Sequence, residues 1–223
     1  MSLAQKVNVM RAAVMGANDG ILSVAGIVIG VAGASTSNFA IFISGIAGML
    51  AGTVSMAMGE YVSVNSQKDS QKRAIIQQKA ALATNYQQEY EFVHQKYLAH
   101  GIAPALAKKA TDEMMAKDPL TTTVRERFGF NPKEFTSPYE AALASMIAFP
   151  TGSILPLAAI TLFPEKIKVL ATFISVVIAL GLTGYFAAIL SKADKFHGLL
   201  RNVISGIITM VVTFGIGYLI GNF

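Results

Sequence analysis

Residues 12–34 read AAVMGANDGILSVAGIVIGVAGA, an apolar run of 23 residues that carries one charge, Asp19. A run of about 18 apolar residues is already long enough to indicate a membrane-spanning helix. A carboxylate at membrane depth costs at least ~2.5 kcal/mol, so such residues usually face a protein interior and mark an ion pathway. We therefore expect Asp19 to lie on a transport path; the alternative is a structural hydrogen bond to a neighbouring helix.

Four further runs contain no Asp, Glu, Lys or Arg: residues 39–59, 141–163, 169–190 and 202–223. Only 14% of the chain is charged, compared with about 25% in soluble domains. The sequence thus predicts an all-α, polytopic membrane protein with five transmembrane helices. We expect spans one and two in residues 1–65, a helical domain in 66–137 and spans three to five in 138–223.

The distribution of basic residues predicts the orientation. If the N-terminus is cytoplasmic, sixteen of the 18 Lys and Arg fall on the cytoplasmic side, as the positive-inside rule requires. The C-terminus then lies outside and residues 66–137 form a cytoplasmic insert.

The net charge of +5 is explained by this topology, and no basic stripe indicates nucleic-acid binding. The first run carries Asp19 and is followed at once by another span, which is unlike a signal peptide. The short termini favour a prokaryotic plasma membrane.

The insert has several residues that typically begin or end helices, and it has no strand pattern. No Gly or Pro lies between Gly59 and Gly101, so the second span is expected to continue as one helix to about Asn85. We predict helices from 86 to 100, from 104 to about 117, and from 119 until Gly129. Asp118 is the expected N-cap of the last of these helices.

Three side chains of the first two spans are expected to converge. Glu60 lies just past the apolar part of the second span, and Met56 lies four residues earlier on the same helical face. If the spans are antiparallel neighbours, both residues share the cytoplasmic half of the membrane with Asp19. Carboxylates suit Mg²⁺, Ca²⁺ and Mn²⁺, whereas a thioether favours transition metals. Asp19 and Glu60 are also candidates for proton exchange, because burial shifts carboxylates toward the protonated form.

Each ligand has a simpler interpretation. Met56 is one of ten methionines, and the alternative to a ligand role is that its side chain packs against neighbouring helices. The alternative for Glu60 is a carboxylate at the membrane interface.

An enzyme is not expected, because the chain has no cysteine and no His-Glu-x-x-His motif. The alternative function is a membrane scaffold or metal sensor that transports nothing. The pairs Gly26/Gly30, Gly48/Gly52 and Gly217/Gly221 permit close helix packing or homodimerisation.

The sequence resembles the vacuolar iron transporter family, which includes yeast-type Ca²⁺/Mn²⁺ cross-complementer proteins. The resemblance rests on residues 16–23 (GANDGILS), 55–64 (SMAMGEYVSV), 66–69 (SQKD) and 141–145 (AALAS), and it extends over essentially the whole chain. It implies a homodimer of five-span subunits that exports Fe²⁺, often also Mn²⁺, from the cytosol in exchange for protons. The metals are substrates, and no cofactor is expected. Family pore ligands correspond to Asp19 and Met56, with Glu60 a further residue of the motif.

The insert departs from the family pattern. Iron-transporting members carry many glutamates here, with a Met-Met pair and a Glu just before the closing Leu-Gly. The matching residues 123–129 of this chain read TVRERFG, so Arg127 stands where that glutamate would be. The remaining candidate ligands are Glu89, Glu91, Glu113 and Glu126. We therefore expect an insert whose metal-binding capacity is weakened or lost.

Overall fold

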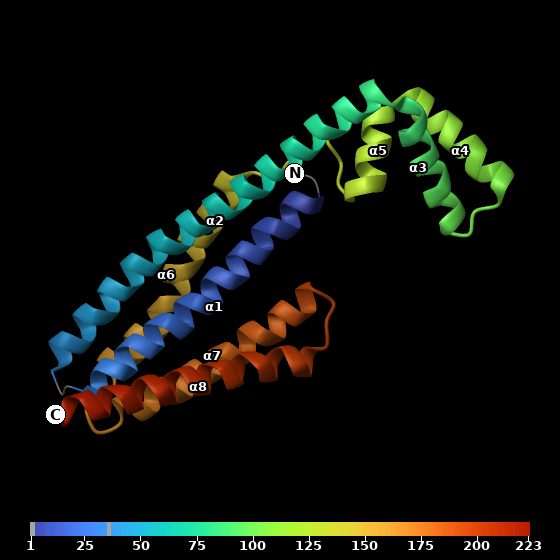
Figure 1. Ribbon diagram of the computed structural model, residues 1–223. Coiled ribbons are helices and arrows are strands. Elements are labelled where there is room, and N and C mark those ends of the chain that lie inside the picture. Colours follow the sequence, from blue (N-terminus) through green and yellow to red (C-terminus); the bar gives the residue numbers. More distant parts are fainter. Residues whose placement is uncertain (1–2, 35–36) are drawn as a thin grey trace. The chain divides into compact units, whose positions relative to one another are not determined.

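The computed structural model describes residues 3–34 and 37–223, so residues 1–2 and 35–36 of the first predicted segment lie outside the described part. The described residues are almost entirely helical and contain no strand (Figure 1), which confirms the predicted all-α class. The helices are α1 (Leu3–Ala34), α2 (Asn38–Thr84), α3 (Tyr86–Ala99), α4 (Pro104–Lys117), α5 (Pro119–Phe128), α6 (Pro138–Leu162), α7 (Lys168–Leu190) and α8 (Lys195–Gly221).

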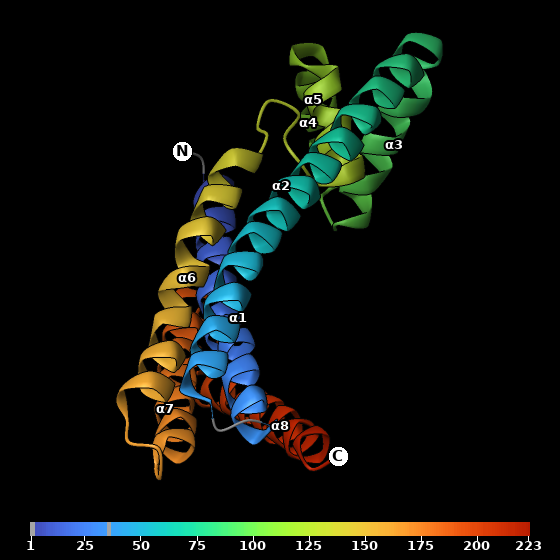
Figure 2. The same cartoon turned by 90° about the vertical axis from the view of Figure 1, so that its left-hand side faces the viewer.

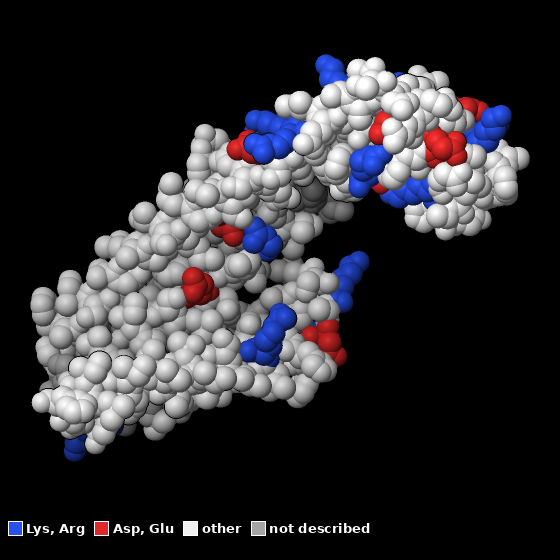
Figure 3. Space-filling model, in the orientation of Figure 1, with Lys and Arg blue, Asp and Glu red and all other residues white. Residues whose placement is uncertain are grey.

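Five of these helices, α1, α2, α6, α7 and α8, are long and apolar enough to cross a membrane, as the sequence predicts. Their membrane-length parts form one compact unit of residues 3–62 and 138–223. Figure 3 shows only isolated acidic and basic side chains on the face of this unit that it presents. An otherwise uncharged surface of this size suits a hydrocarbon environment.

Helix α1 is the central helix of this unit and packs against α6, α7 and α8 (Figures 1 and 2). On the α6 side, a Cβ atom at Gly20 would overlap the carbonyl oxygen of Phe149, and one at Gly152 would overlap that of Ala17. The Ser153 hydroxyl donates hydrogen bonds to the carbonyls of Gly20 (3.2 Å) and Phe149 (2.8 Å). The two glycines therefore allow the α1 and α6 backbones to touch at the depth of Asp19.

A second glycine contact joins α1 to α8. Gly26 and Gly30 face the side chains of Thr209 and Thr213, and a Cβ atom at Gly217 would overlap the carbonyl oxygen of Gly30. Two of the three predicted Gly-x-x-x-Gly pairs thus pack helices together inside one chain. In these pairs Gly26 and Gly217 are buried in the contact between α1 and α8, whereas Gly221 near the end of α8 is exposed.

The membrane-length part of α2 is packed less closely. Only 11% of its most apolar 18-residue window is buried, compared with 44% in α1 and in α6. Its contacts are made by side chains that reach across to glycines: Ile27 lies against Gly48, and Phe149 lies against Gly52. These contacts leave space between α2 and α1.

Residues 63–137 form the second compact unit, which includes the C-terminal part of α2 and helices α3 to α5. Its core contains Val93, Tyr97, Ala107 and Met115. The helix ends follow the predicted signals: the Asp118 side chain accepts the amide of Thr121 at the start of α5. Gly101 and Gly129 adopt the positive φ values that favour glycine after a helix. The predicted helices of the insert are confirmed to within a residue or two.

Candidate functional site

A cavity of about 510 Å³ lies between α1, α2 and α6 of the five-helix unit. It contains all three side chains that the sequence analysis selected for a transport path, Asp19, Met56 and Glu60. Its full lining consists of these residues with Ser23, Ile27, Gly48, Ala51, Gly52, Ser55, Gly59 and Phe149. The structure therefore brings the three predicted residues together, while their role in binding metal stays a prediction.

Asp19 is half-buried and belongs to the wall that α1 contributes. Its carboxylate Oδ1 accepts a hydrogen bond of 2.7 Å from the Ser23 hydroxyl. Residues four apart share one face of a helix, so Asp19, Ser23 and Ile27 all line the cavity. Gly20, on the neighbouring face, is in contact with α6, which fixes the direction in which Asp19 points.

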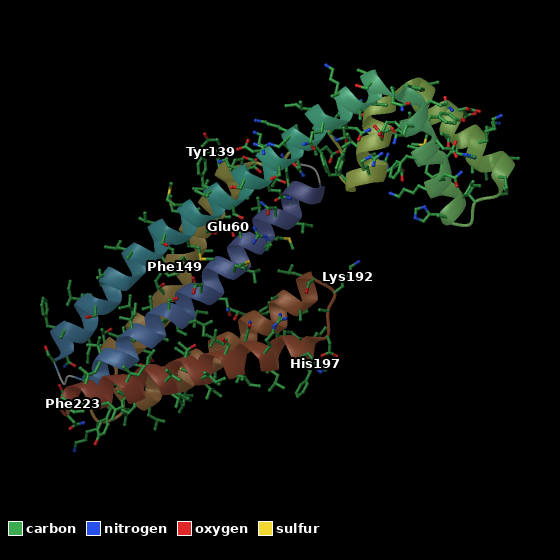
Figure 4. All side chains as sticks on the ribbon, viewed as in Figure 1. Glu60, Tyr139, Phe149, Lys192, His197 and Phe223 are labelled. Atoms are coloured by element: carbon green, nitrogen blue, oxygen red, sulfur yellow. The ribbon has the colours of Figure 1, made fainter. Side chains whose placement is uncertain are left out.

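Helix α2 contributes the opposite wall through another series with a spacing of four residues: Gly48, Gly52, Met56 and Glu60. The two glycines admit the side chains of Ile27 and Phe149 at one end of this series, and the thioether and the carboxylate lie at the other end. Phe149 is 1% exposed and closes the cavity from α6. Figure 4 labels Glu60 and Phe149 on this side of the unit.

The charge of Glu60 is balanced by a residue that the sequence analysis counted only toward the orientation. A guanidinium nitrogen of Arg11 lies 2.8 Å from Oε2 of Glu60. The Glu60 side chain is 8% exposed and that of Arg11 is 44% exposed. A signal was present in the sequence, because Arg11, Met15, Asp19 and Ser23 follow each other at a spacing of four. What the spacing did not indicate is that Arg11 reaches across to α2.

The cavity offers oxygen ligands from two carboxylates and two serine hydroxyls, and one softer sulfur ligand from Met56. This donor set suits a divalent transition-metal ion better than a purely oxygen-lined cavity does. No group of three or more His, Cys, Asp or Glu side chains that could hold a metal occurs among the residues that the structure describes.

In the second unit, the best candidate ligand among the glutamates is already paired. Glu89 is buried and accepts hydrogen bonds from Arg127 at 2.8 and 3.1 Å and from the Gln78 amide at 2.6 Å. The Arg127 guanidinium also stacks on the Phe92 ring, 3.9 Å from its centroid. Burial of a carboxylate is tolerated when it is paired and hydrogen-bonded in this way.

The other glutamates of this unit do not gather around Glu89. Glu126 pairs with Lys96 at 3.3 Å and accepts a hydrogen bond from the Tyr97 hydroxyl; burial and the Glu126 charge raise the pKa of Tyr97. Glu91 and Glu113 are exposed on the surface. Arg127 and Lys96 thus pair with the two least exposed of these four glutamates, Glu89 and Glu126.

The chain is similar over nearly its whole length to known proteins. Residues 10–218 match the sequence model of the VIT family. "Vacuolar iron transporter" of Acanthamoeba castellanii is 32% identical over 94% of this chain and 78% of its own. "Vacuolar iron transporter homolog 3" of Arabidopsis thaliana is 34% identical over 96% and 84% of the two chains. "Vacuolar iron transporter homolog 5" of Oryza sativa subsp. japonica is 33% identical over 97% and 82%.

These matches identify the protein's class. Five membrane-length helices together with relatives of this kind make it a multi-pass membrane protein. The family match spans both compact units, from α1 into α8. The chain therefore belongs to the VIT family.

Proposed function

We propose that this protein transports divalent transition-metal ions, Fe²⁺ or Mn²⁺, across a membrane. The observation that carries the proposal is the cavity shared by Asp19, Met56 and Glu60, because it combines carboxylate and thioether ligands inside a five-helix membrane unit. The names of the relatives, which refer to iron transport, support the same function. Lipid surrounds the five spans, and the metal ion is a substrate rather than a resident cofactor.

Transport is coupled to protons and directed out of the cytosol. At membrane depth, a carboxylate such as Asp19 has a high free-energy cost when it is ionised and no metal ion is bound to it. After the metal leaves, a proton can neutralise the carboxylate, and this exchange amounts to antiport. The N-terminus and residues 66–137 lie on the cytosolic side of a prokaryotic plasma membrane, in line with the positive-inside rule. Protease cleavage of residues 63–137 from that side alone is the outcome that fits this orientation.

The working unit is a homodimer. Helix α2 leaves large apolar side chains exposed along its membrane-length part, among them Leu50, Val54 and Met58. In this arrangement the second copy also adds ligands to those that Asp19, Met56 and Glu60 supply in one chain. Chemical cross-linking in the membrane should then trap a dimer; a species that stays monomeric throughout would contradict this arrangement.

The second unit has lost most of its capacity to store metal. Arg127 and Lys96 bring fixed positive charges to Glu89 and Glu126, where a bound metal would otherwise supply them. Replacing these lysine and arginine contacts by a metal would require breaking paired and partly buried groups. This unit therefore keeps its fold without metal.

Metal flux in proteoliposomes under an imposed pH gradient tests the transport proposal. We expect the wild type to move Fe²⁺ or Mn²⁺ and the Asp19→Asn variant to lose at least about 90% of this flux, because one charge is missing from the path. Asp69→Asn is the matched control, since Asp69 is an exposed carboxylate of α2 whose nearest basic partner is Lys72 at 3.8 Å. Flux that is equal in all three proteins would refute the assignment of the path, and no flux in any of them would favour a scaffold or sensor.

A further inference from the structure

Arg11 lies between two pockets of the five-helix unit, the cavity with Asp19 and Glu60 and a groove between α1 and α7. Its guanidinium contacts Glu60 of the metal cavity at 2.8 Å, and it also reaches Met15 Sδ and Asn8 Oδ1, each at 3.2 Å. The Arg11 side chain also lines a separate groove of about 580 Å³ between α1 and α7. The other cationic residue of that groove is Lys192, which lies beyond the end of α7 (Figure 4).

The pair of Arg11 and Glu60 conflicts with metal binding as long as it is formed. Glu60 is nearly buried, so a positively charged partner stabilises its ionised form. One of its oxygens is engaged by the guanidinium. A metal ion that approaches Glu60 must therefore either share the carboxylate with a positive charge close by or displace that charge.

Displacement is possible for Arg11 and difficult for Glu60. The Arg11 side chain is 44% exposed, whereas Glu60 is 8% exposed. The groove between α1 and α7 gives a long, flexible arginine side chain a place to move into, and its apolar part suits the arginine stem. The guanidinium can thus leave while the carboxylate stays in the cavity.

We propose that Arg11 is a built-in counter-ion that occupies Glu60 when no metal is bound and is displaced by the incoming ion. The inference rests on the proposed transport function and adds a selectivity element to it. A divalent ion interacts with a carboxylate more strongly than a guanidinium does at the same distance, because Coulomb energy scales with charge. A monovalent ion has no such advantage, so the exchange favours divalent over monovalent cations.

The test compares KM for Mn²⁺ flux in the wild type, Arg11→Gln and Lys192→Gln. We expect Arg11→Gln to lower KM by about twofold to fivefold, the range for losing a partly exposed competing charge. Lys192→Gln should leave KM unchanged, because Lys192 lines the same groove without an ion pair to Glu60. Equal shifts in both variants would mean that general surface charge is responsible and would overturn the proposal.

Two further variants separate competition from a structural role. In a Glu60→Gln background, the Arg11→Gln change should no longer lower KM, because no carboxylate remains to compete for. Arg11→Lys keeps the charge with fewer donors and should give a KM between the wild type and Arg11→Gln; it also serves if Arg11→Gln fails to fold. A wild-type KM in Arg11→Lys and Arg11→Gln, with Asp19→Asn inactive, would refute the counter-ion and leave the transport function standing. Absence of flux in the wild type would instead refute the transport function itself.

Discussion

Asp19 and Glu60 lie in one cavity but are stabilised by different means. Asp19 is held by a hydroxyl of its own helix, whereas Glu60 is held by a guanidinium from another helix. The neutral Ser23 hydroxyl leaves the negative charge of Asp19 available to an ion, whereas the Arg11 cation already neutralises the charge of Glu60. Within the proposed path, Asp19 is therefore the more accessible of the two carboxylates for the first contact with metal.

Substitution of Met56 tests whether its sulfur atom contributes to the selectivity among metal ions. We expect Met56→Leu to reduce the preference for Fe²⁺ or Mn²⁺ over Mg²⁺ by roughly tenfold, about 1.4 kcal/mol of differential binding, because leucine keeps the volume but removes the thioether. Competition of Mg²⁺ with Mn²⁺ flux in proteoliposomes measures this ratio. The control is Met146→Leu, since Met146 of α6 is exposed and outside the cavity lining; an unchanged ratio in Met56→Leu would assign Met56 to packing.

At the scale of single residues, the sequence was informative where chemistry and helical spacing coincide. Asp19 is a lone charge in an apolar run, and Met56 and Glu60 are one turn apart, so their convergence could be predicted from two antiparallel spans. The Arg11 contact could not be predicted in this way, because it depends on how far apart α1 and α2 lie and on a long side chain that crosses between them.

At the scale of helices, the packing of α1 against α6 depends on a backbone contact that leaves no room for a side chain at Gly20 or Gly152. We expect Gly152→Ala to destabilise the protein by about 1–3 kcal/mol, since its Cβ would collide with the backbone of Ala17 and the two helices would have to separate. Gly215→Ala is the control, because no atom lies within 4 Å of a Cβ added there, and it should be neutral or stabilising by up to ~1 kcal/mol. Thermal unfolding in detergent compares the two variants; equal stabilities would show that the α1–α6 contact can relax at no cost.

The start of α5 gives a pH-dependent prediction. The Lys133 ammonium and the Thr121 backbone and hydroxyl donors lower the pKa of Asp118 from 3.8 to about 2. A carboxylate whose pKa is lower in the folded state stabilises that state above its unfolded pKa and loses this effect as the pH falls through the folded value. We therefore expect Asp118→Asn to exchange the Thr121 amide hydrogen faster than the wild type above about pH 4. The difference should disappear toward pH 2, and a constant difference over this range would contradict the ionic origin.

The helix boundaries of the second unit were well predicted because they depend on local signals. Asn85, Asp118 and the two positive-φ glycines act within a few residues of their own position. The close approach of α1 to α8 was harder to predict from the sequence. The Gly-x-x-x-Gly spacing indicates a contact surface but does not say whether the partner helix belongs to the same chain, and here Gly217 meets Gly30 of its own chain.

At the scale of the whole molecule, the number of bound metal ions distinguishes the two compact units. If the glutamates of residues 63–137 are held by Arg127 and Lys96, calorimetric titration of the Asp19→Asn protein with Mn²⁺ should detect no site of micromolar affinity or better. The wild type, titrated in parallel, should differ from the variant only by the cavity site. Several tight sites that remain in the variant would show that the second unit binds metal despite its ion pairs.

The backbone contacts of α1 also determine where new substrate preferences can arise. One face of α1 is in contact with α6 and another with α8, and on both faces the contact tolerates glycine but no larger residue. Substitutions on α1 therefore risk the fold before they alter the cavity. Helix α2 contributes seven of the eleven residues that line the cavity, and little of its apolar part is buried, so substitutions there are expected to destabilise the fold less. A relative or an engineered variant with a different ionic substrate is expected to have diverged mainly at Ala51, Ser55 and Met56, because a Cβ atom at Gly48 or Gly52 would overlap Ile27 or Phe149.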